Sequence, residues 1–106
     1  MNRRQQLAAV KRMRKLLAKP DAWCKGYEAI RRDSFGASST SPKNPSASSW
    51  CLLGAAKRCR ADTQGHHECL RWASTEPLVQ FNDAPETTHR DVLRFLDACI
   101  KKLEGK

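Results

Sequence analysis

Long hydrophobic runs are missing from this 106-residue chain, and its longest apolar stretches are short. A membrane-spanning helix needs about 20 consecutive apolar residues, so we expect no transmembrane segment. We predict no secretory signal either, because basic residues interrupt Leu7–Leu17. The chain contains 40% hydrophobic and 29% charged residues, a globular composition. The sequence therefore predicts one domain over residues 1–106.

Signatures of the common enzyme classes are also missing. The sequence contains no glycine-rich phosphate-binding loop, zincin motif, hydrolase nucleophile elbow or kinase signature. We therefore expect no cofactor and favour a non-enzymatic protein over an enzyme. A disulfide framework is not predicted, since the five cysteines are odd in number and widely spaced. Reduced cysteines in apolar patterns indicate a reducing compartment, and we expect a cytoplasmic location.

Acidic residues are absent from the first 19 positions, although the chain as a whole carries a net charge of +9. The basic residues in this segment are Arg3, Arg4, Lys11, Arg12, Arg14, Lys15 and Lys19. Such a field attracts polyanions, which include nucleic acid, an anionic membrane surface and an acidic protein. The alternative is a solvated helix face that only keeps the protein soluble.

The basic segment has the apolar periodicity of a helix. Its apolar residues recur at three- and four-residue steps, at Leu7, Val10, Met13 and Leu17. The opposite face carries the candidate partner-binding residues, Arg4, Lys11, Arg12, Lys15 and Lys19. Pro20 and Asp21 are expected to end this helix.

The middle of the chain gives weaker patterns. Trp23–Asp33 predicts a turn followed by a short helix or an extended piece. Ser34–Ser49 contains seven serines and two prolines, which predicts a flexible surface loop. Trp50–Arg60 is apolar almost all round before Lys57, so it predicts a buried helix with Ser48 or Ser49 as its N-cap.

The last third predicts further helices. We expect a short helix over residues 65–74 and a turn over residues 82–85. Thr88 and Asp91 have the spacing of a capping-box variant at the start of a C-terminal helix. No alternating pattern long enough for a sheet is found. The fold class expected is therefore all-α, a small bundle or orthogonal array of about four helices with a long serine-rich loop.

Several phrases together resemble a known family of small bacterial and phage proteins of unknown function. Its members carry W-x-x-G, R-D-x-x-G, W-C-L-x-G-A and N-D followed by T-x-x-E-V-L. The matching residues here are Trp23–Gly26, Arg32-Asp33 with Gly36, Trp50–Ala55, Asn82-Asp83, and Thr88 with Asp91–Leu93. Phe81 stands where a tryptophan is expected, and Asp91 replaces the usual glutamate. The resemblance implies a small helical fold and a bacterial or phage source, and it implies no activity.

Histidines and cysteines near the middle of the chain are candidate zinc ligands, because zinc binds four nitrogen or sulfur ligands. They are His66, His67, Cys69 and Cys59, with Cys51 further upstream. Their successive spacings of eight, seven and two residues do not match a paired-knuckle pattern. We therefore favour packing for the cysteines and an exposed loop for the histidines, and predict no metal site.

Cys51, His89 and Asp83 are the candidates for cysteine-dependent catalysis. Cys51 lies near the start of a predicted helix, where the helix dipole lowers a thiol pKa. His89 is the candidate base, and Asn82 or Asp83 is available to orient its ring. The alternative is that Trp50 and Cys51 belong to the core and that Asn82-Asp83 forms a turn. We favour this alternative, since no local signature of a cysteine enzyme is present.

The polar phrases Arg32-Asp33 and Asn82-Asp83 have two interpretations. They could form the floor of a pocket, or they could form turns and helix caps, and we favour the second interpretation.

For the whole chain, the leading hypothesis is a non-enzymatic accessory protein that binds a macromolecule through its basic first helix. An acidic protein surface is the favoured partner, and a host factor is a candidate for it if the gene is phage-borne. Nucleic acid is the first alternative partner, although no aromatic residues are interleaved with the basic ones. A small cysteine-dependent enzyme is the other alternative.

Overall fold

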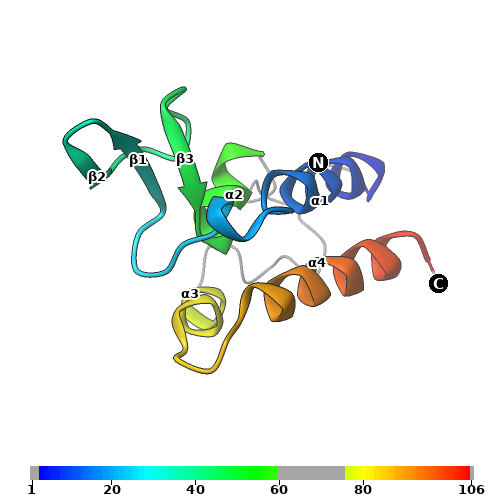
Figure 1. The fold of residues 1–106 in the computed structure, drawn as a ribbon. Helices are drawn as coiled ribbons and strands as arrows, with labels where there is room; N and C mark the ends of the chain where they lie inside the picture. The colour runs from blue at the N-terminus through cyan, green and yellow to red at the C-terminus, as the bar shows by residue number, and fades with distance from the viewer. Residues whose placement is uncertain (1–2, 60–75, 106) are drawn as a thin grey trace.

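A computed structural model describes residues 3–59 and 76–105 of the chain. The helices are α1 (Arg3–Leu16), α2 (Leu52–Arg58), α3 (Glu76–Asp83) and α4 (His89–Leu103), with a short 3-10 turn η1 (Pro20–Ala22). The strands are β1 (Ala29–Asp33), β2 (Gly36–Ser39) and β3 (Ala47–Trp50). The sheet lies at one end of the molecule and the α1–α4 pair at the other, with α2 between them (Figure 1).

The three strands form one antiparallel sheet in the order β2-β1-β3. The prediction of an all-α fold is therefore wrong, and the protein combines α-helices with a small sheet. β1 and β2 form a hairpin in which Asp33 pairs with Gly36, and Ser34 and Phe35 make the two-residue turn. Of the two alternatives for Trp23–Asp33, the extended one is correct from residue 29 onward.

The serine-rich segment 34–49 is not simply a loop, because it contains β2 and most of β3. Every residue of β2 is exposed, so the strand shows none of the apolar–polar alternation that marks a half-buried strand. Backbone pairing with β1 defines these strands, and such pairing leaves no trace in hydropathy. In β3 the burial increases toward its end, where Ser49 and Trp50 enter the core.

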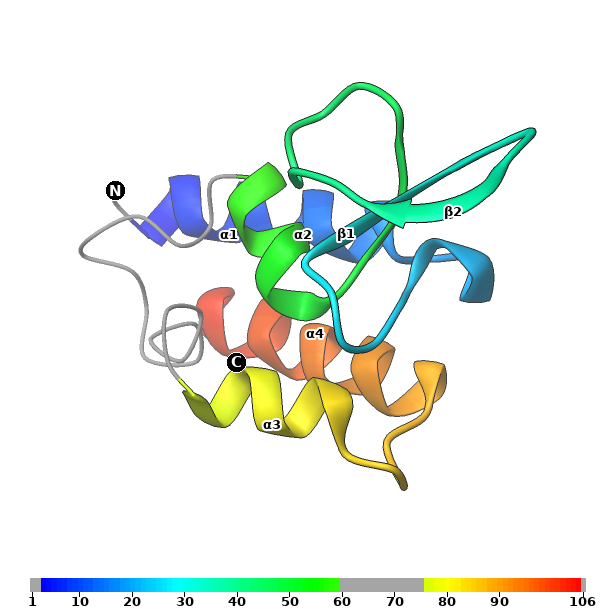
Figure 2. The ribbon, with the colours of Figure 1, turned by 90° about the vertical axis from the view of Figure 1, so that its left-hand side faces the viewer.

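Helices α1 and α4 pack side by side in opposite directions, as Figures 1 and 2 both show. The predicted apolar face of α1 is confirmed, since Val10, Met13 and Leu17 are buried and Leu7 packs against the same core. The α4 residues buried against them are Val92, Leu96, Cys99 and Leu103. None of the helices in the described residues is long and apolar enough to cross a membrane.

The start of α4 confirms the predicted capping box. Thr88 Oγ1 accepts a hydrogen bond from Asp91 N at 3.2 Å, and Asp91 Oδ2 accepts one from Thr88 N at 3.0 Å. These reciprocal bonds satisfy amide groups that have no partner inside the helix. They also hold the pKa of the Asp91 carboxyl below its ordinary value. The preceding turn begins later than expected, because Asn82 and Asp83 still belong to α3.

Helix α2 begins two residues later than the sequence pattern indicates. Its N-cap is Cys51, whose Sγ accepts a hydrogen bond from Gly54 N at 3.3 Å, so the prediction of Ser48 or Ser49 as the cap is wrong. Trp50 ends β3 instead, and its indole Nε1 donates to Pro42 O at 3.0 Å. The helix predicted over residues 65–74 lies outside the described residues.

Candidate functional site

Asn82 is the centre of a hydrogen-bond network between distant parts of the chain. Its side chain is fully buried at the end of α3. Its Oδ1 accepts from Trp23 Nε1 at 2.7 Å and from Leu52 N at 3.0 Å. Its Nδ2 donates to Cys24 O at 3.1 Å and to Asp83 Oδ1 at 2.9 Å. A single amide therefore caps the start of α2 and attaches the 23–24 segment to α3.

Asp83 and Lys25 reinforce the same junction. Asp83 Oδ1 accepts from Gly26 N at 3.0 Å, and Lys25 Nζ donates to Ala84 O at 2.6 Å. Lys25 Nζ also lies 5.5 Å from the centre of the Trp23 ring, within the range of a cation–π contact. Gly26 has φ +83, which favours glycine. The W-x-x-G and N-D phrases thus meet in space, and Asn82 has the capping role that we favoured.

The residues of the Arg32-Asp33 phrase form hydrogen bonds that stabilise the sheet. Asp33 Oδ1 accepts from Phe35 N at 2.8 Å, the Asx turn expected of this residue type. Arg32 Nη1 donates to Ser49 Oγ at 2.6 Å, and Ser49 Oγ donates to Asp21 O at 2.9 Å. In the described residues these bonds do not join the Asn82-Asp83 network, so the two polar phrases do not form one pocket floor.

The turn at residues 26–28 packs directly against the first turn of α2. Cys51 N donates to Glu28 O at 3.3 Å. A Cβ added to Gly54 would lie 1.7 Å from Glu28 O, so only glycine allows this approach. The glycine of the W-C-L-x-G-A phrase, Gly54, is therefore required by the close contact between α2 and the turn that follows W-x-x-G.

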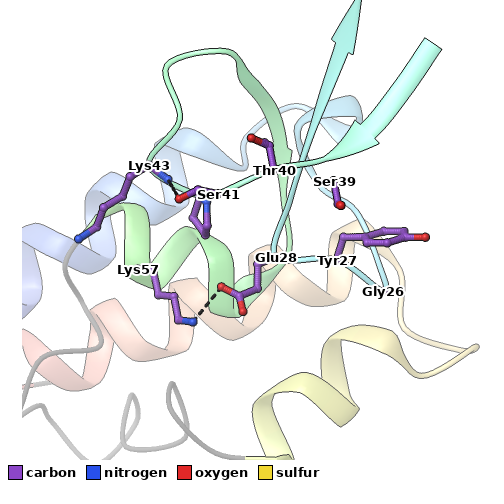
Figure 3. A pocket seen from close by; sticks show the side chains of 9 residues that line it. Gly26, Tyr27, Glu28, Ser39, Thr40, Ser41, Lys43 and Lys57 are labelled. Carbon is purple, nitrogen blue, oxygen red and sulfur yellow. Dashed lines mark hydrogen bonds and ion pairs between the residues drawn. The ribbon is translucent and has the colours of Figure 1, made fainter. Parts of the chain in front are cut away.

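An open groove lies beside this turn, with a volume of about 640 Å³ (Figure 3). It is lined by Gly26–Glu28, the 39–43 segment and Lys57. Lys57 Nζ forms an ion pair with Glu28 Oε1 at 2.8 Å. Lys43 is exposed and its ammonium has no partner among the described residues. Hydroxyls and a free cation suit this groove to a polar, negatively charged group.

The sequence did not point to this groove. Tyr27 and Glu28 directly follow the W-x-x-G phrase, and that adjacency is the signal that would have found them. Lys43 and Lys57 are isolated basic residues in the sequence, and no pattern distinguishes them from other surface lysines.

In the described residues, the three candidates for cysteine catalysis form hydrogen bonds to other groups and not to one another. Burial raises the pKa of the Cys51 thiol, and the nearby carboxylates of Asp83 and Glu28 raise it further, although hydrogen bonds from backbone amides oppose the shift. His89 Nε2 donates to Leu17 O at 2.6 Å. Within residues 3–59 and 76–105, no hydrogen bond joins this ring to the thiol. Asp83 accepts from Gly26 N and Asn82 rather than from His89.

We expect every thiol in the described residues to react slowly in the folded protein at neutral pH. Burial is the main reason that the pKa values of Cys24, Cys51 and Cys59 are raised, and it raises that of Cys24 from 9.0 to about 11. In a Cys69→Ser variant, Ellman's reagent should label the folded chain much more slowly than the urea-unfolded chain, because little thiolate is present and access is limited. A cysteine that reacts faster in the folded state would contradict this expectation and support the enzyme hypothesis.

The raised pKa of Cys24 also has a consequence for stability. Folding favours the neutral form of the Cys24 thiol. The thiol's contribution to the free energy of unfolding is therefore fully present below pH 9 and is lost as the pH rises through about 11. Urea unfolding should therefore show a free energy of unfolding that falls between pH 9 and about 11. Replacing Cys24 by serine should make this fall smaller, and an unchanged fall in that variant would contradict the assignment.

The metal-ligand candidates are only partly described. His66, His67 and Cys69 lie outside the described residues. Cys59 is buried at the C-cap of α2. Among residues 3–59 and 76–105, no group of three or more histidines, cysteines or acidic residues could hold a metal ion.

The basic residues of α1 divide into two groups. Arg12 Nη2 donates to Cys59 O at 2.9 Å, so this side chain helps to hold α2 against α1. Arg4, Lys11 and Lys15 lie one above another on the exposed side of the helix, and we call these three residues the outer face of α1. Only Lys11 of the three has an acidic neighbour in the described part of the chain, Glu104 Oε2 at 3.8 Å. Lys19 follows the helix and is also exposed.

Comparison with known proteins gives one match. The sequence profile of a family of unknown function (DUF6197) matches residues 1–102. No curated protein and no solved structure matches the chain.

Proposed function

The chain belongs to this family of unknown function, and for this member we propose a non-enzymatic accessory protein that binds an acidic macromolecular partner through the outer face of α1. A protein surface is the partner we favour. The cysteines of the described residues, Cys24, Cys51, Cys59 and Cys99, are free thiols, which supports a cytoplasmic location in a bacterium or in the host of a phage.

The observation that carries this proposal is a row of exposed cations in which, among the described residues, only Lys11 has an acidic neighbour, Glu104. Arg4, Lys11 and Lys15 are all exposed, and α1 contains no acidic residue. Arg4 lies in the first turn, where a positive charge opposes the helix dipole and does not stabilise the helix. Binding an acidic surface would account for its position, because complementary charge accelerates association.

Helix α4 offers a matched comparison on the same molecule. Its exposed side carries three basic residues, Arg90, Arg94 and Lys101. Asp97 lies on the same side of α4 and forms an ion pair with Arg14 at 2.8 Å. Helix α4 contains two acidic residues, Asp91 and Asp97, and α1 contains none, so α4 is the less positive of the two helices although Asp97 is paired with Arg14 of α1.

Charge reversal tests the proposal. The variant R4E/K11E/K15E should lose binding to its partner by roughly tenfold or more, chiefly through slower association. The variant R90E/R94E/K101E changes the net charge equally and should bind as the wild type does. Both would be tagged and used in pull-downs from bacterial lysate, with one half of each lysate treated with nuclease. Circular dichroism would check that both variants remain folded.

The two variants and the nuclease together separate the possible outcomes. The proposal is supported if a partner protein is still recovered after nuclease treatment and its recovery is lost only with the α1 variant. Recovery that disappears with nuclease would replace it by nucleic-acid binding, which should also weaken steeply with salt. Equal binding by the two variants would show that the outer face of α1 is not the binding surface.

A further inference from the structure

Strand β2 has an open edge. In the part of the chain that the structure describes, β2 pairs only with β1, whereas the outer edge of β3 is bridged to Trp23. Figure 1 shows β2 at the outer end of the sheet, away from the helices. An unpaired strand edge presents backbone donors and acceptors that can bind another extended chain.

The register shows which backbone groups face outward. Thr40 N donates to Ala29 O at 3.1 Å, and the same register pairs Arg31 with Ser38. Hydrogen-bonded pairs alternate along an antiparallel ladder, so the backbone groups of Ser38 face β1. The N–H and C=O groups of Ala37 and Ser39 therefore point to the open edge. A second strand would find two donors and two acceptors there.

Charged side chains and proline, two of the features that usually protect an edge, are missing from β2. Its sequence, Gly36–Ser39, contains no charged residue and no proline, and all four residues are exposed. The strand is short, which limits non-specific pairing, but its four small side chains leave the backbone accessible to another chain.

Exposed apolar side chains lie at both ends of this edge. Tyr27 is 57% exposed and Phe35 is 99% exposed, and they are the large hydrophobic residues exposed in the described part of the chain. Phe35 immediately precedes β2. Tyr27 lines a hollow of about 180 Å³ together with Ile30 and residues 37–39 (Figure 3 shows Tyr27 beside Ser39). Apolar exposure of this kind marks binding sites.

The charges around β2 define the partner further. Arg31 lies beside Ser38 on one face of the sheet, with its Nε 3.3 Å from Ser38 Oγ. Lys43 stands beyond the end of β2 without an acidic partner in the described residues. Glu28 is paired with Lys57, whereas Asp33 accepts a hydrogen bond from the amide of Phe35 and keeps its negative charge. Arg31, Arg32 and Lys43 outnumber this carboxylate around β2, so the surroundings of the edge are net positive and attract acidic residues.

We propose that the open edge of β2 binds an extended segment of a partner protein in which acidic and apolar residues alternate. Side chains opposite Ala37 and Ser39 would enter the hollow at Tyr27, and those opposite Ser38 would lie on the face that carries Arg31. Main-chain bonds supply affinity, and the two faces supply specificity. This surface lies apart from the outer face of α1, so the proposal does not depend on the function proposed above.

Three synthetic peptides test the proposal by fluorescence anisotropy with the full chain. The first alternates glutamate and valine over six central residues, the second replaces each glutamate by lysine, and the third has a central proline. Only the first should bind. In the same complex, amide exchange followed by NMR should slow at Ala37 and Ser39 and stay unchanged at Ser38. Exchange that slows elsewhere, or no binding of the first peptide, would overturn the proposal.

Variants of β2 give an independent test. Ala37→Pro removes an outward N–H and should weaken peptide binding roughly tenfold relative to the wild type, and circular dichroism would check that this variant stays folded. Arg31→Glu should reverse the preference, so that the lysine peptide binds better than the glutamate peptide. A folded Ala37→Pro variant that binds the peptide as tightly as the wild type would contradict the edge site. Dimerisation of the free protein that Ala37→Pro abolishes would assign the edge to a second copy of this chain and overturn the proposal.

Discussion

Replacing Asn82 by alanine is expected to lower the free energy of unfolding by roughly 3–5 kcal/mol. The side chain is fully buried and makes hydrogen bonds to four groups. The variant would leave the indole N–H of Trp23, the amide of Leu52 and the carbonyl of Cys24 without this partner. Each buried polar group that loses its partner costs about 1–3 kcal/mol, and the loss would weaken the contacts among α2, α3 and the 23–24 segment.

Urea unfolding of the two proteins at neutral pH measures this difference. Gln80→Ala is the matched control, because Gln80 is an exposed amide in the same helix and should change stability by less than about 0.5 kcal/mol. If Asn82→Ala and Gln80→Ala were equally stable, the network around Asn82 would not hold the junction together.

Replacing Gly54 by alanine is expected to destabilise the protein by at least about 3 kcal/mol or to prevent folding. In an ordinary helix the same change stabilises by about 1 kcal/mol, because glycine is a poor helix former. Here the new Cβ would lie 1.7 Å from Glu28 O, so the turn at residues 26–28 would have to leave α2. The expected sign is therefore opposite to that of helix propensity.

Thermal unfolding with Gly26→Ala as a comparison separates two causes. Gly26 has open space around its Cα but φ +83, so alanine there should cost only about 1–2 kcal/mol of backbone strain. A larger loss for Gly54→Ala would identify steric overlap as the reason for glycine in α2. A stabilised Gly54→Ala protein would mean that α2 and the turn are not in close contact.

These two positions also explain what the family phrases do. Asn82 and Gly54 belong to the N-D and W-C-L-x-G-A phrases, and both hold the segment that begins with W-x-x-G. The resemblance was recognised from the sequence and the family is confirmed, but the contacts between its phrases span up to 59 positions. The phrases build the frame of the groove at Tyr27 and Glu28.

Helices α1 and α4 were determined by the sequence itself. Their apolar residues recur with the helical period, and the Thr88–Asp91 capping box is a contact between residues three positions apart. Such local patterns are complete within a short segment, so they can be read without knowing the rest of the fold. The basic outer face of α1 follows from the same periodicity.

The sheet, the groove and the open edge were decided by the tertiary structure. Strand β2 is exposed on both faces, so hydropathy does not distinguish it from a loop, and only pairing with β1 makes it a strand. Likewise, nothing local shows that Asn82 accepts from Trp23 or that Gly54 meets Glu28. Contacts within one helical turn leave a period in the sequence, whereas contacts between distant segments depend on how the whole chain packs.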